Sequence, residues 1–230
     1  MSRRHQAGIS MLELLIGMLL AMFAVMAMLS LSRTTSRVTA LSRLGVQTDA
    51  QLATGLLAAD KLLAQAGYFA VTASGSVPVP RYPDDLRLLQ NATLGGSAQA
   101  LLLAPASGTL VAQAGQGQAL LWRSRDASGV FRYDGLYAPA SGGLWRIHGS
   151  SMDWAGWTQA EQLLGAPPRG HDSLASAGVA SFAVSRAAGG CQPFGVGSSA
   201  SGGVYTVRIS ALAYSAGQRV DSHTCLMNFQ

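Results

Sequence analysis

Residues 9–31 read ISMLELLIGMLLAMFAVMAMLSL and contain one charged side chain, Glu13. A run of about 20 apolar residues is enough to cross the ~30 Å hydrocarbon core of a bilayer as a helix. A short basic segment, MSRRHQAG, precedes the run and ends in Gly8. Because a carboxylate inside an apolar helix is costly, we expect Glu13 to have a partner. Cleavage after Gly8 would supply one, since the new α-amino group of Ile9 would lie four residues before Glu13, or close to Glu13 of a neighbouring chain.

The basic leader, the glycine and the acidic residue together resemble the start of a type IV prepilin, which carries a class III signal peptide. The resemblance covers Arg3-Arg4, Gly8 and the segment ISMLELLIG of residues 9–17. It implies that a prepilin peptidase cuts after Gly8, that Ile9 becomes a methylated N-terminus, and that Glu13 acts in filament assembly. Most members of this family have Phe or Met where this chain has Ile9, which also meets the apolar requirement.

Two other interpretations of the apolar run fit it less well. A secretory signal peptide has an apolar core of about 7–15 residues followed by a small-residue cleavage site. The run here is longer, although Ala21, Ala24 and Ala27 imitate such a site. A simple signal anchor explains the length of the run but not Glu13.

Helical spacing continues beyond the apolar run and predicts one long helix from Ile9 to Ala66. Gly45 and Gly55 each weaken a helix interior by about 1 kcal/mol relative to Ala, so a break near Gly45 is the alternative. Gly67 is expected to end the helix. The first half would lie in the membrane or the filament core, and the second half would pack one apolar stripe on a globular domain. The stripe comprises Leu41, Leu44, Leu52, Leu56, Ala59, Leu63 and Ala66.

Two later segments extend the resemblance. Residues 46–69 resemble the second helical segment of PilW-like minor pilins, and Ala66-Gly67-Tyr68 keeps its typical ending. Val207-Arg208-Ile209 resembles the C-terminal strand of that family. The resemblance implies a type IV pilin-like α+β fold, in which the long helix, apolar and then amphipathic, packs on a C-terminal antiparallel sheet. Three regions are expected: a leader (1–8), the helix (9–67) and a β-rich globular domain (68–230).

Short apolar runs separated by Gly, Ser and Gln predict the strands of this domain. The clearest strand is Val204 to Tyr214, which alternates apolar and polar residues. Asp134-Gly135 lies between apolar residues and predicts a two-residue hairpin turn. Residues 187–203 read as a long loop, and Met227 with Phe229 suggests a short final strand. The other expected strands lie at residues 101–103, 109–111, 119–122, 130–133, 136–137, 144–147 and 179–184.

The two cysteines, Cys191 and Cys225, are expected to form a disulfide if the domain is exported. The alternative is a metal or nucleophile site that uses His223, but His223-Thr224-Cys225 with one distant cysteine matches no zinc pattern.

No sequence pattern indicates an enzyme, a cofactor or a metal. The chain lacks the nucleophile elbow, the His-Glu-Xaa-Xaa-His pattern and the phosphate loop. His148, His171 and His223 stand alone in the sequence, and Asp84-Asp85 reads as a solvated turn or a helix start rather than a metal or acid–base pair. The formal charge is +5, but the basic residues are scattered, so no nucleic-acid surface is indicated.

Charge alone does not orient the span, because Arg3 and Arg4 precede it and Arg33, Arg37 and Arg43 follow it. The resemblance places the leader on the cytoplasmic face of the bacterial inner membrane, where the peptidase works. The globular domain is then periplasmic, and the processed protein reaches a pilus on the cell surface.

The resemblance as a whole implies a minor pilin that primes assembly of a type IV pilus and is incorporated at its tip, with roles in twitching motility and adhesion. The implied partners are the prepilin peptidase, other minor pilins, the major pilin, the inner-membrane assembly platform, membrane lipid and a tip adhesin. One alternative is a J-type minor pseudopilin of type II secretion, which shares the leader and a similar domain. Another is a membrane-anchored periplasmic binding or enzymatic domain, which needs no cleavage at Gly8.

We predict that the mature chain begins at Ile9 and that Gly8→Glu blocks the cut, because the peptidase site must accept a residue without a side chain. N-terminal mass analysis of the membrane-bound protein checks this. An intact Met1, or a cut near Ala27, would contradict the prepilin interpretation.

Overall fold

The computed structural model describes ten stretches of the chain. The chain divides into two units, Met1–Gln47 and Thr48–Gln230. The second unit is called the head below, and helix α1 (Met11–Ala64) belongs to both units. The described stretches are 11–69, 80–81, 84–92, 109–110, 115–139, 142–153, 157–165, 181–192, 203–214 and 218–229.

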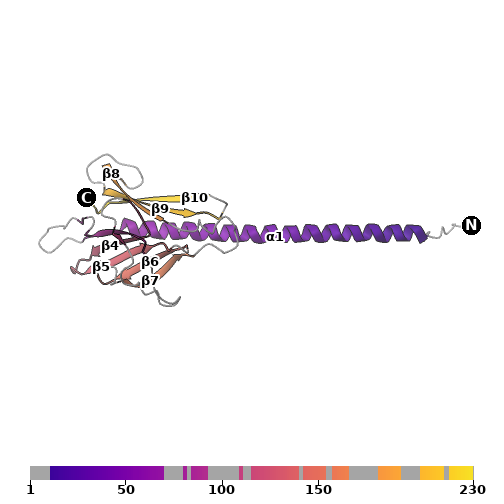
Figure 1. Ribbon diagram of the computed structural model, residues 1–230, viewed down its shortest axis with the longest axis horizontal. Coiled ribbons are helices and arrows are strands. Elements are labelled where there is room, and N and C mark those ends of the chain that lie inside the picture. Colours follow the sequence, from indigo (N-terminus) through magenta and orange to yellow (C-terminus); the bar gives the residue numbers. More distant parts are fainter. Residues whose placement is uncertain are drawn as a thin grey trace, which may run out of the picture. The chain divides into compact units, whose positions relative to one another are not determined.

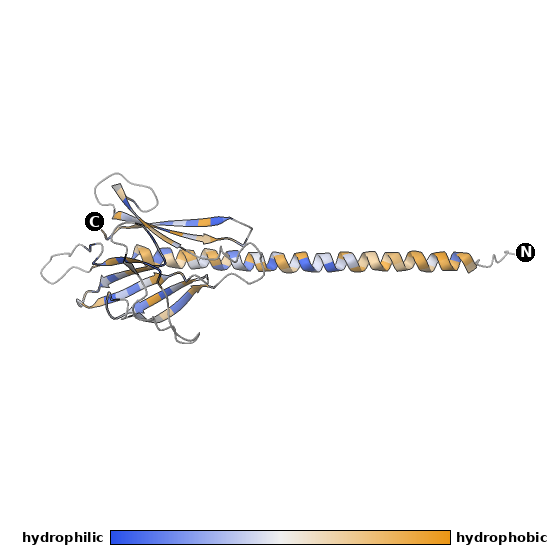
Figure 2. Ribbon diagram, in the orientation of Figure 1, coloured by the Kyte–Doolittle hydropathy of each residue, from blue (hydrophilic) through white to orange (hydrophobic). Residues whose placement is uncertain are grey.

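In the first unit, α1 is apolar around its whole circumference near its start, and its large apolar side chains are exposed (Figure 2). By length and composition, α1 is a candidate membrane anchor or signal sequence, and none of its 18-residue apolar window is buried. The helix runs through Gly45 without interruption, so the alternative of a break there is wrong. Thr34, Thr35 and Thr39 donate their hydroxyls to carbonyl oxygens four residues earlier, which satisfies these polar groups within the helix.

In the head, the amphipathic half of α1 buries its stripe as predicted. Leu56 is 6 % exposed and Leu63 is fully buried, whereas Leu44, earlier on the same stripe, is 42 % exposed. Packing of the stripe therefore begins at Leu52 and not at Leu41. The helix ends at Ala64, and Gly67 follows with φ +70°, the left-handed conformation expected of a helix-ending glycine. A Cβ at Gly67 would also lie 2.4 Å from the ring of Phe229, so no other residue fits there.

A six-stranded antiparallel sheet forms one layer of the head, in the order β2-β1-β4-β5-β6-β7. Neighbouring strands pair in a regular register except between β6 and β7, where two irregularities occur. The strands are β1 (Leu86–Gln90), β2 (Thr109–Leu110), β4 (Ala119–Arg125), β5 (Phe131–Tyr137), β6 (Leu144–Gly149) and β7 (Trp157–Leu164).

A four-stranded antiparallel sheet forms the second layer, in the order β10-β9-β8-β3. Strands β9 and β10 pair over eight consecutive residues without a shift. The strands are β3 (Gly115–Gly117), β8 (Ser181–Cys191), β9 (Gly203–Leu212) and β10 (Arg219–Leu226). One long helix with two antiparallel sheets is an α+β arrangement, as expected.

The main hydrophobic core joins the buried stripe of α1 to one face of each sheet (Figure 1). Trp122 and Leu136 come from the six-stranded sheet, and Phe182 and Ile209 come from the four-stranded sheet. A second cluster lies on the opposite face of the six-stranded sheet, around the fully buried Trp157. Trp157 is therefore a core residue.

Two carboxylates of α1 bind the region of the four-stranded sheet, one on β10 and one on the segment that follows β9. Asp60 accepts hydrogen bonds from the hydroxyls of Ser222, at 2.6 and 2.7 Å, and of Thr224, at 2.6 Å. Earlier on the same helix, Asp49 accepts a hydrogen bond of 2.9 Å from the backbone N–H of Tyr214. These bonds set the position of the helix along β10, which the apolar stripe alone does not fix.

The predicted hairpin turn at Asp134-Gly135 is wrong, because both residues lie inside β5. Asp134 pairs with His148 and Gly135 with Ile147 across β6. A Cβ at Gly135 would lie 2.8 Å from the Leu121 side chain, so this glycine serves close packing and not chain reversal.

Three strand predictions need correction. β8 continues to Cys191, so the loop predicted from residue 187 begins later. The final strand is β10, and Met227 and Phe229 follow it rather than form it. β1, β3 and β7 were not predicted at all. The strand expected at 101–103 lies outside the described residues.

We predict that Leu63→Ala lowers the free energy of unfolding by about 2–5 kcal/mol, the usual cost of truncating a buried leucine. Leu57→Ala, on the exposed side of the same helix, should change it by less than about 0.5 kcal/mol. Denaturant unfolding of the full chain in detergent, followed by near-ultraviolet circular dichroism, compares the two. Equal losses would contradict the assignment of the buried face.

Candidate functional site

The acidic residue of the apolar run, Glu13, lies in the first turn of α1. Gly8 and Ile9, the predicted cleavage site, lie outside the described residues. The structure therefore describes Glu13, the predicted assembly residue, but not the predicted site of processing.

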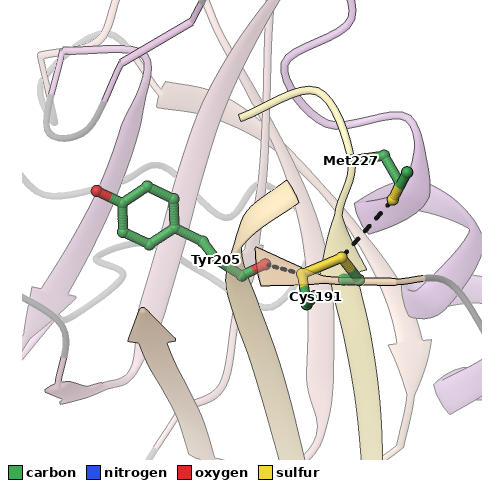
Figure 3. Close-up of a disulfide and its surroundings, with 4 residues drawn as sticks. Cys191, Tyr205 and Met227 are labelled. Carbon is green, nitrogen blue, oxygen red and sulfur yellow. Dashed lines mark hydrogen bonds between the residues drawn. A yellow bond between two sulfur atoms is a disulfide. The ribbon is translucent and has the colours of Figure 1, made fainter. Parts of the chain in front are cut away.

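The predicted disulfide between Cys191 and Cys225 is present and connects the end of β8 to the end of β10 (Figure 3). The two Cα atoms are 5.6 Å apart. Cys191 Sγ lies 3.2 Å from the carbonyl oxygen of Tyr205, on the strand between them, and Cys225 Sγ lies 3.7 Å from Met227 Sδ. Since Cys225 is oxidised, the alternative of a metal or nucleophile site with His223 is wrong for this state of the protein.

A groove of about 650 Å³ lies between the end of α1 and strands β4, β5 and β6 of the head. Its volume falls in the range of small-ligand and peptide-side-chain sites. Apolar and charged side chains both line it, the buried Trp122 among them. The other lining residues are Leu62, Ala64, Gln65, Tyr68, Ser124, Arg125, Asp126, Ala127, Arg132, Asp134, Arg146 and Asn228.

A charge cluster centres on Asp134, which lines this groove and whose side chain is 17 % exposed. Its Oδ1 accepts a 2.9 Å hydrogen bond from Arg146 Nη2 and also lies 2.9 Å from His148 Nδ1. Arg146 Nη1 also lies 4.0 Å from Glu161 on β7. His148, which stands alone in the sequence, thus lies beside a carboxylate because the β5–β6 register brings the two together.

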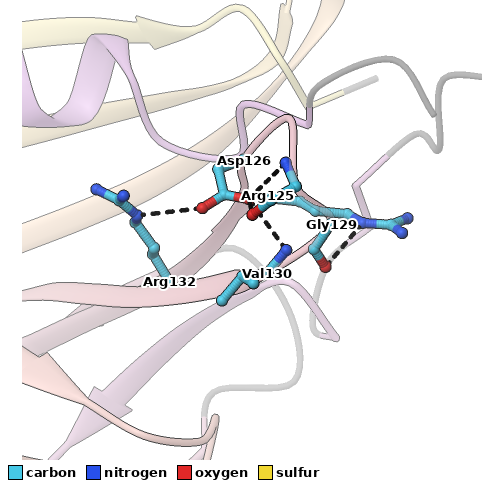
Figure 4. Close-up of polar contacts among 6 residues, drawn as sticks. Arg125, Asp126, Gly129, Val130 and Arg132 are labelled. Atoms are coloured by element: carbon cyan, nitrogen blue, oxygen red, sulfur yellow. Dashed lines mark hydrogen bonds and ion pairs between the residues drawn. The ribbon is translucent and has the colours of Figure 1, made fainter. Parts of the chain in front are cut away.

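The β4–β5 connection forms one end of the groove and is tightly bonded (Figure 4). Asp126 Oδ1 accepts from the N–H of Ser128, at 3.0 Å, from its hydroxyl, at 2.5 Å, and from the N–H of Val130, at 3.0 Å. Arg125 Nε donates to the Gly129 carbonyl at 3.2 Å, and Gly129 has φ +86°. The side chain of Asp126 therefore closes the turn between β4 and β5.

The hydroxyl of Ser128, followed by the N–H of Val130, holds the pKa of Asp126 below its ordinary value. A carboxyl group with a lowered folded-state pKa stabilises the fold above its unfolded pKa. This contribution is lost as the pH falls through the lowered value, so the turn is weakened only in acid.

The adjacent acidic residues Asp84 and Asp85 differ in their surroundings. Asp84 is exposed, as expected of a turn, but Asp85 is only 5 % exposed, so its assignment to a solvated turn is wrong. Asp85 pairs with Arg123 and accepts a 2.7 Å hydrogen bond from the N–H of Arg81. The guanidinium of Arg123 in turn lies 4.7 Å from the ring centre of Phe131.

Among the described residues, no group of three or more histidine, cysteine or acidic side chains is placed to hold a metal ion. His223 is exposed on β10, and His171 lies outside the described stretches. The residues that sequence reasoning missed are those of the β4–β5 turn. The segment Asp126-Ala127-Ser128-Gly129 contains residue types typical of a turn, which is the signal that could have found it.

Comparison of the chain with protein-family models, curated proteins and solved structures found no match. Inference of its function therefore depends on its own residues and their geometry.

We predict that Cys225→Ser lowers the free energy of unfolding by about 2–5 kcal/mol, the usual cost of removing a native disulfide. The double variant with Cys191→Ser should match the single one, because the bond rather than either thiol carries the effect. Denaturant unfolding with and without reductant checks this. Wild-type protein that is equally stable in both conditions would contradict a stabilising role.

Proposed function

We propose that the chain is a PilW-like minor pilin, made as an inner-membrane prepilin and incorporated after processing at the tip of a type IV pilus. The observation that carries the proposal is the order of features along one helix. A basic leader ending in Gly8 precedes Glu13 and an apolar run, and the same helix then packs an amphipathic half into the head.

The packing of the head supports this assignment. The apolar half of α1 is uniformly exposed in the isolated chain, which is expected of a segment made to lie in lipid or among other apolar helices. The stripe of its second half is covered from two sides by sheets. The disulfide suits a head that folds in the oxidising periplasm.

In the proposed function, the prepilin peptidase removes residues 1–8 on the cytoplasmic face, and Ile9 becomes the methylated N-terminus. The protein then joins other minor pilins and the major pilin on the inner-membrane assembly platform. It primes the filament, stays at its tip and helps to present an adhesin. It carries out no catalysis and needs no cofactor.

Glu13 sets the axial position of each subunit in this proposal. Apolar helices that pack together exclude water, so a carboxylate or an ammonium group without a partner becomes costly. Glu13 paired with the Ile9 amine of a neighbouring subunit removes both costs at one axial offset and penalises the others.

A J-type minor pseudopilin of type II secretion is the main alternative, since the same leader and helix serve it. Deletion in the native host separates the two. Loss of pili and twitching supports the pilin, and loss of exoprotein secretion with intact pili supports the pseudopilin. A membrane-anchored binding domain would instead keep Met1.

We predict that Glu13→Val leaves membrane level and cleavage unchanged but prevents assembly, because the span becomes more apolar while the neighbouring ammonium loses its partner. The variant replaces the native copy, and membrane level, N-terminal mass and pilus number are measured. Leu20→Val, an apolar exchange in the same run, is the matched control and should assemble normally. Normal piliation of Glu13→Val with normal cleavage would leave Glu13 as a residue that only reaches toward water at the membrane surface.

A further inference from the structure

Exposed apolar side chains of the head gather at one place. Among the described residues of the head, five large apolar side chains are exposed. Three of them, Tyr68, Val130 and Phe131, lie on the two segments that flank the end of β4. Tyr68 precedes Phe69, which bridges to Arg125, and the Tyr68 carbonyl accepts a 2.8 Å hydrogen bond from the Arg125 N–H. Val130 and Phe131 lie opposite, where Phe131 pairs with Arg125. The five exposed side chains are Leu57, Tyr68, Val130, Phe131 and Val220.

The turn that carries two of these side chains is pre-organised. One carboxylate oxygen of Asp126 accepts hydrogen bonds from three donors within the turn. In addition, the Asp126 N–H donates to the Val130 carbonyl, and the Gly129 N–H donates to the Asp126 carbonyl. Val130 is nonetheless 57 % exposed. A rigid element that keeps an apolar side chain in water loses little conformational entropy when a partner covers it.

Phe131 is held from several sides. Its ring lies edge-on to Phe69 at 6.0 Å, and the guanidinium groups of Arg123 and Arg125 lie 4.7 and 5.7 Å from its centre. Arg123 is fixed by the buried Asp85. Phe131 still exposes 38 % of its surface. Aromatic and arginine side chains in this arrangement are typical of the energetically dominant residues of protein interfaces.

The charge around the turn is positive. Asp85 neutralises Arg123, and the Asp126 carboxylate is engaged inside the turn, with Arg132 Nε 3.7 Å from its second oxygen. Among the described residues, no carboxylate lies within ion-pair distance of Arg125, and the side chain of Arg132 is 72 % exposed. In Figure 4 the two guanidinium groups extend to opposite sides of the turn.

We propose that the β4–β5 turn, with Arg125, Val130, Phe131 and Arg132, is a docking element for a partner protein that presents a carboxylate beside an apolar side chain. The apolar side chain covers Val130 and Phe131, and the carboxylate meets Arg125 or Arg132. The adjoining groove of about 650 Å³, which Arg125 and Arg132 also line, receives the segment that follows. This inference goes beyond the filament proposal and does not need it.

Charge decides between this occupant and two others. A second copy of the chain would bring the same two arginines against themselves in a two-fold contact, and like charges oppose that arrangement. Anionic lipid is disfavoured because surface binding of membranes depends on clusters of several cations, and this turn has two arginines and no lysine.

The experiment uses the full chain in neutral detergent and a fluorescein-labelled peptide, Gly-Glu-Leu-Asp-Phe-Glu-Gly. Its control peptide has Gln and Asn in place of Glu and Asp. Fluorescence anisotropy should give at least about tenfold tighter binding for the acidic peptide, because charge-assisted hydrogen bonds are stronger than neutral ones. Raising the salt from about 50 to about 500 mM should weaken that binding.

Matched variants locate the site on the head. Arg125→Gln and Val130→Ser should each weaken binding of the acidic peptide about fivefold or more, as expected for interface residues of this kind. Arg186→Gln on β8 and Val220→Ser on β10 remove an exposed arginine and an exposed valine elsewhere, and should leave binding unchanged. Circular dichroism confirms that each variant is folded before its binding is compared.

Three outcomes would overturn the proposal. The first is equal binding of the two peptides, or equal effects of the test and control variants. The second is a dimer of the full chain that Arg125→Gln dissociates, which would assign the surface to a second copy. The third is protection of the 126–130 amides from hydrogen exchange in phosphatidylglycerol nanodiscs without peptide, which would assign it to lipid.

Discussion

Burial of one stripe of α1 between two antiparallel sheets is the contact on which the head depends. The core cluster that includes residues of both sheets also includes Leu52, Leu56 and Leu63. Burial of each leucine side chain stabilises the folded state by roughly 1.5–3 kcal/mol. The cluster that contains these leucines also contains Trp122 of the six-stranded sheet and Phe182 of the four-stranded sheet. The same helix is apolar on every side nearer its start, so its second half is packed in a protein core and its first half exposes apolar side chains all round.

Apolar burial alone would tolerate sliding of the helix, and polar contacts remove that freedom. Asp60 binds Ser222 and Thr224, while the side-chain amide of Asn228 donates a 2.8 Å hydrogen bond to the Ala66 carbonyl. Hydrogen bonds to a charged group contribute about 1.5–3 kcal/mol, more than a neutral pair. The disulfide joins β8 to the same end of β10 through Cys225. The helix, β10 and the chain end after it therefore hold one another in register.

Features that depend on a single local signal in the sequence were predicted correctly. The helix, the glycine at its end, β9 and the disulfide each follow from periodicity, backbone conformation or redox chemistry. Sequence reasoning failed at Asp134-Gly135, because a local turn signal was overridden by packing that only the sheet register reveals. It failed at Asp85 for the same reason, since its partner Arg123 is distant in sequence. Edge strand β7 begins with the buried Trp157 but continues with polar residues, of which Glu161 and Gln162 are exposed, so no apolar run marked it. Asp126 and Gly129 could have indicated the β4–β5 turn of the docking element from the sequence. The exposure of Val130 and Phe131 beside that turn could not have been predicted.

The β4–β5 turn holds more bonds than chain reversal requires. A turn of this length needs a backbone hydrogen bond and one residue that accepts positive φ, which Gly129 supplies. The three further bonds to the Asp126 carboxylate and the one from Arg125 to Gly129 fix the direction of the strand that follows. Without them, Val130 and Phe131 could fold back and bury their surfaces, as apolar side chains at a flexible tip tend to do. Local order that maintains apolar exposure works against stability, so its most economical explanation is a partner that covers the tip.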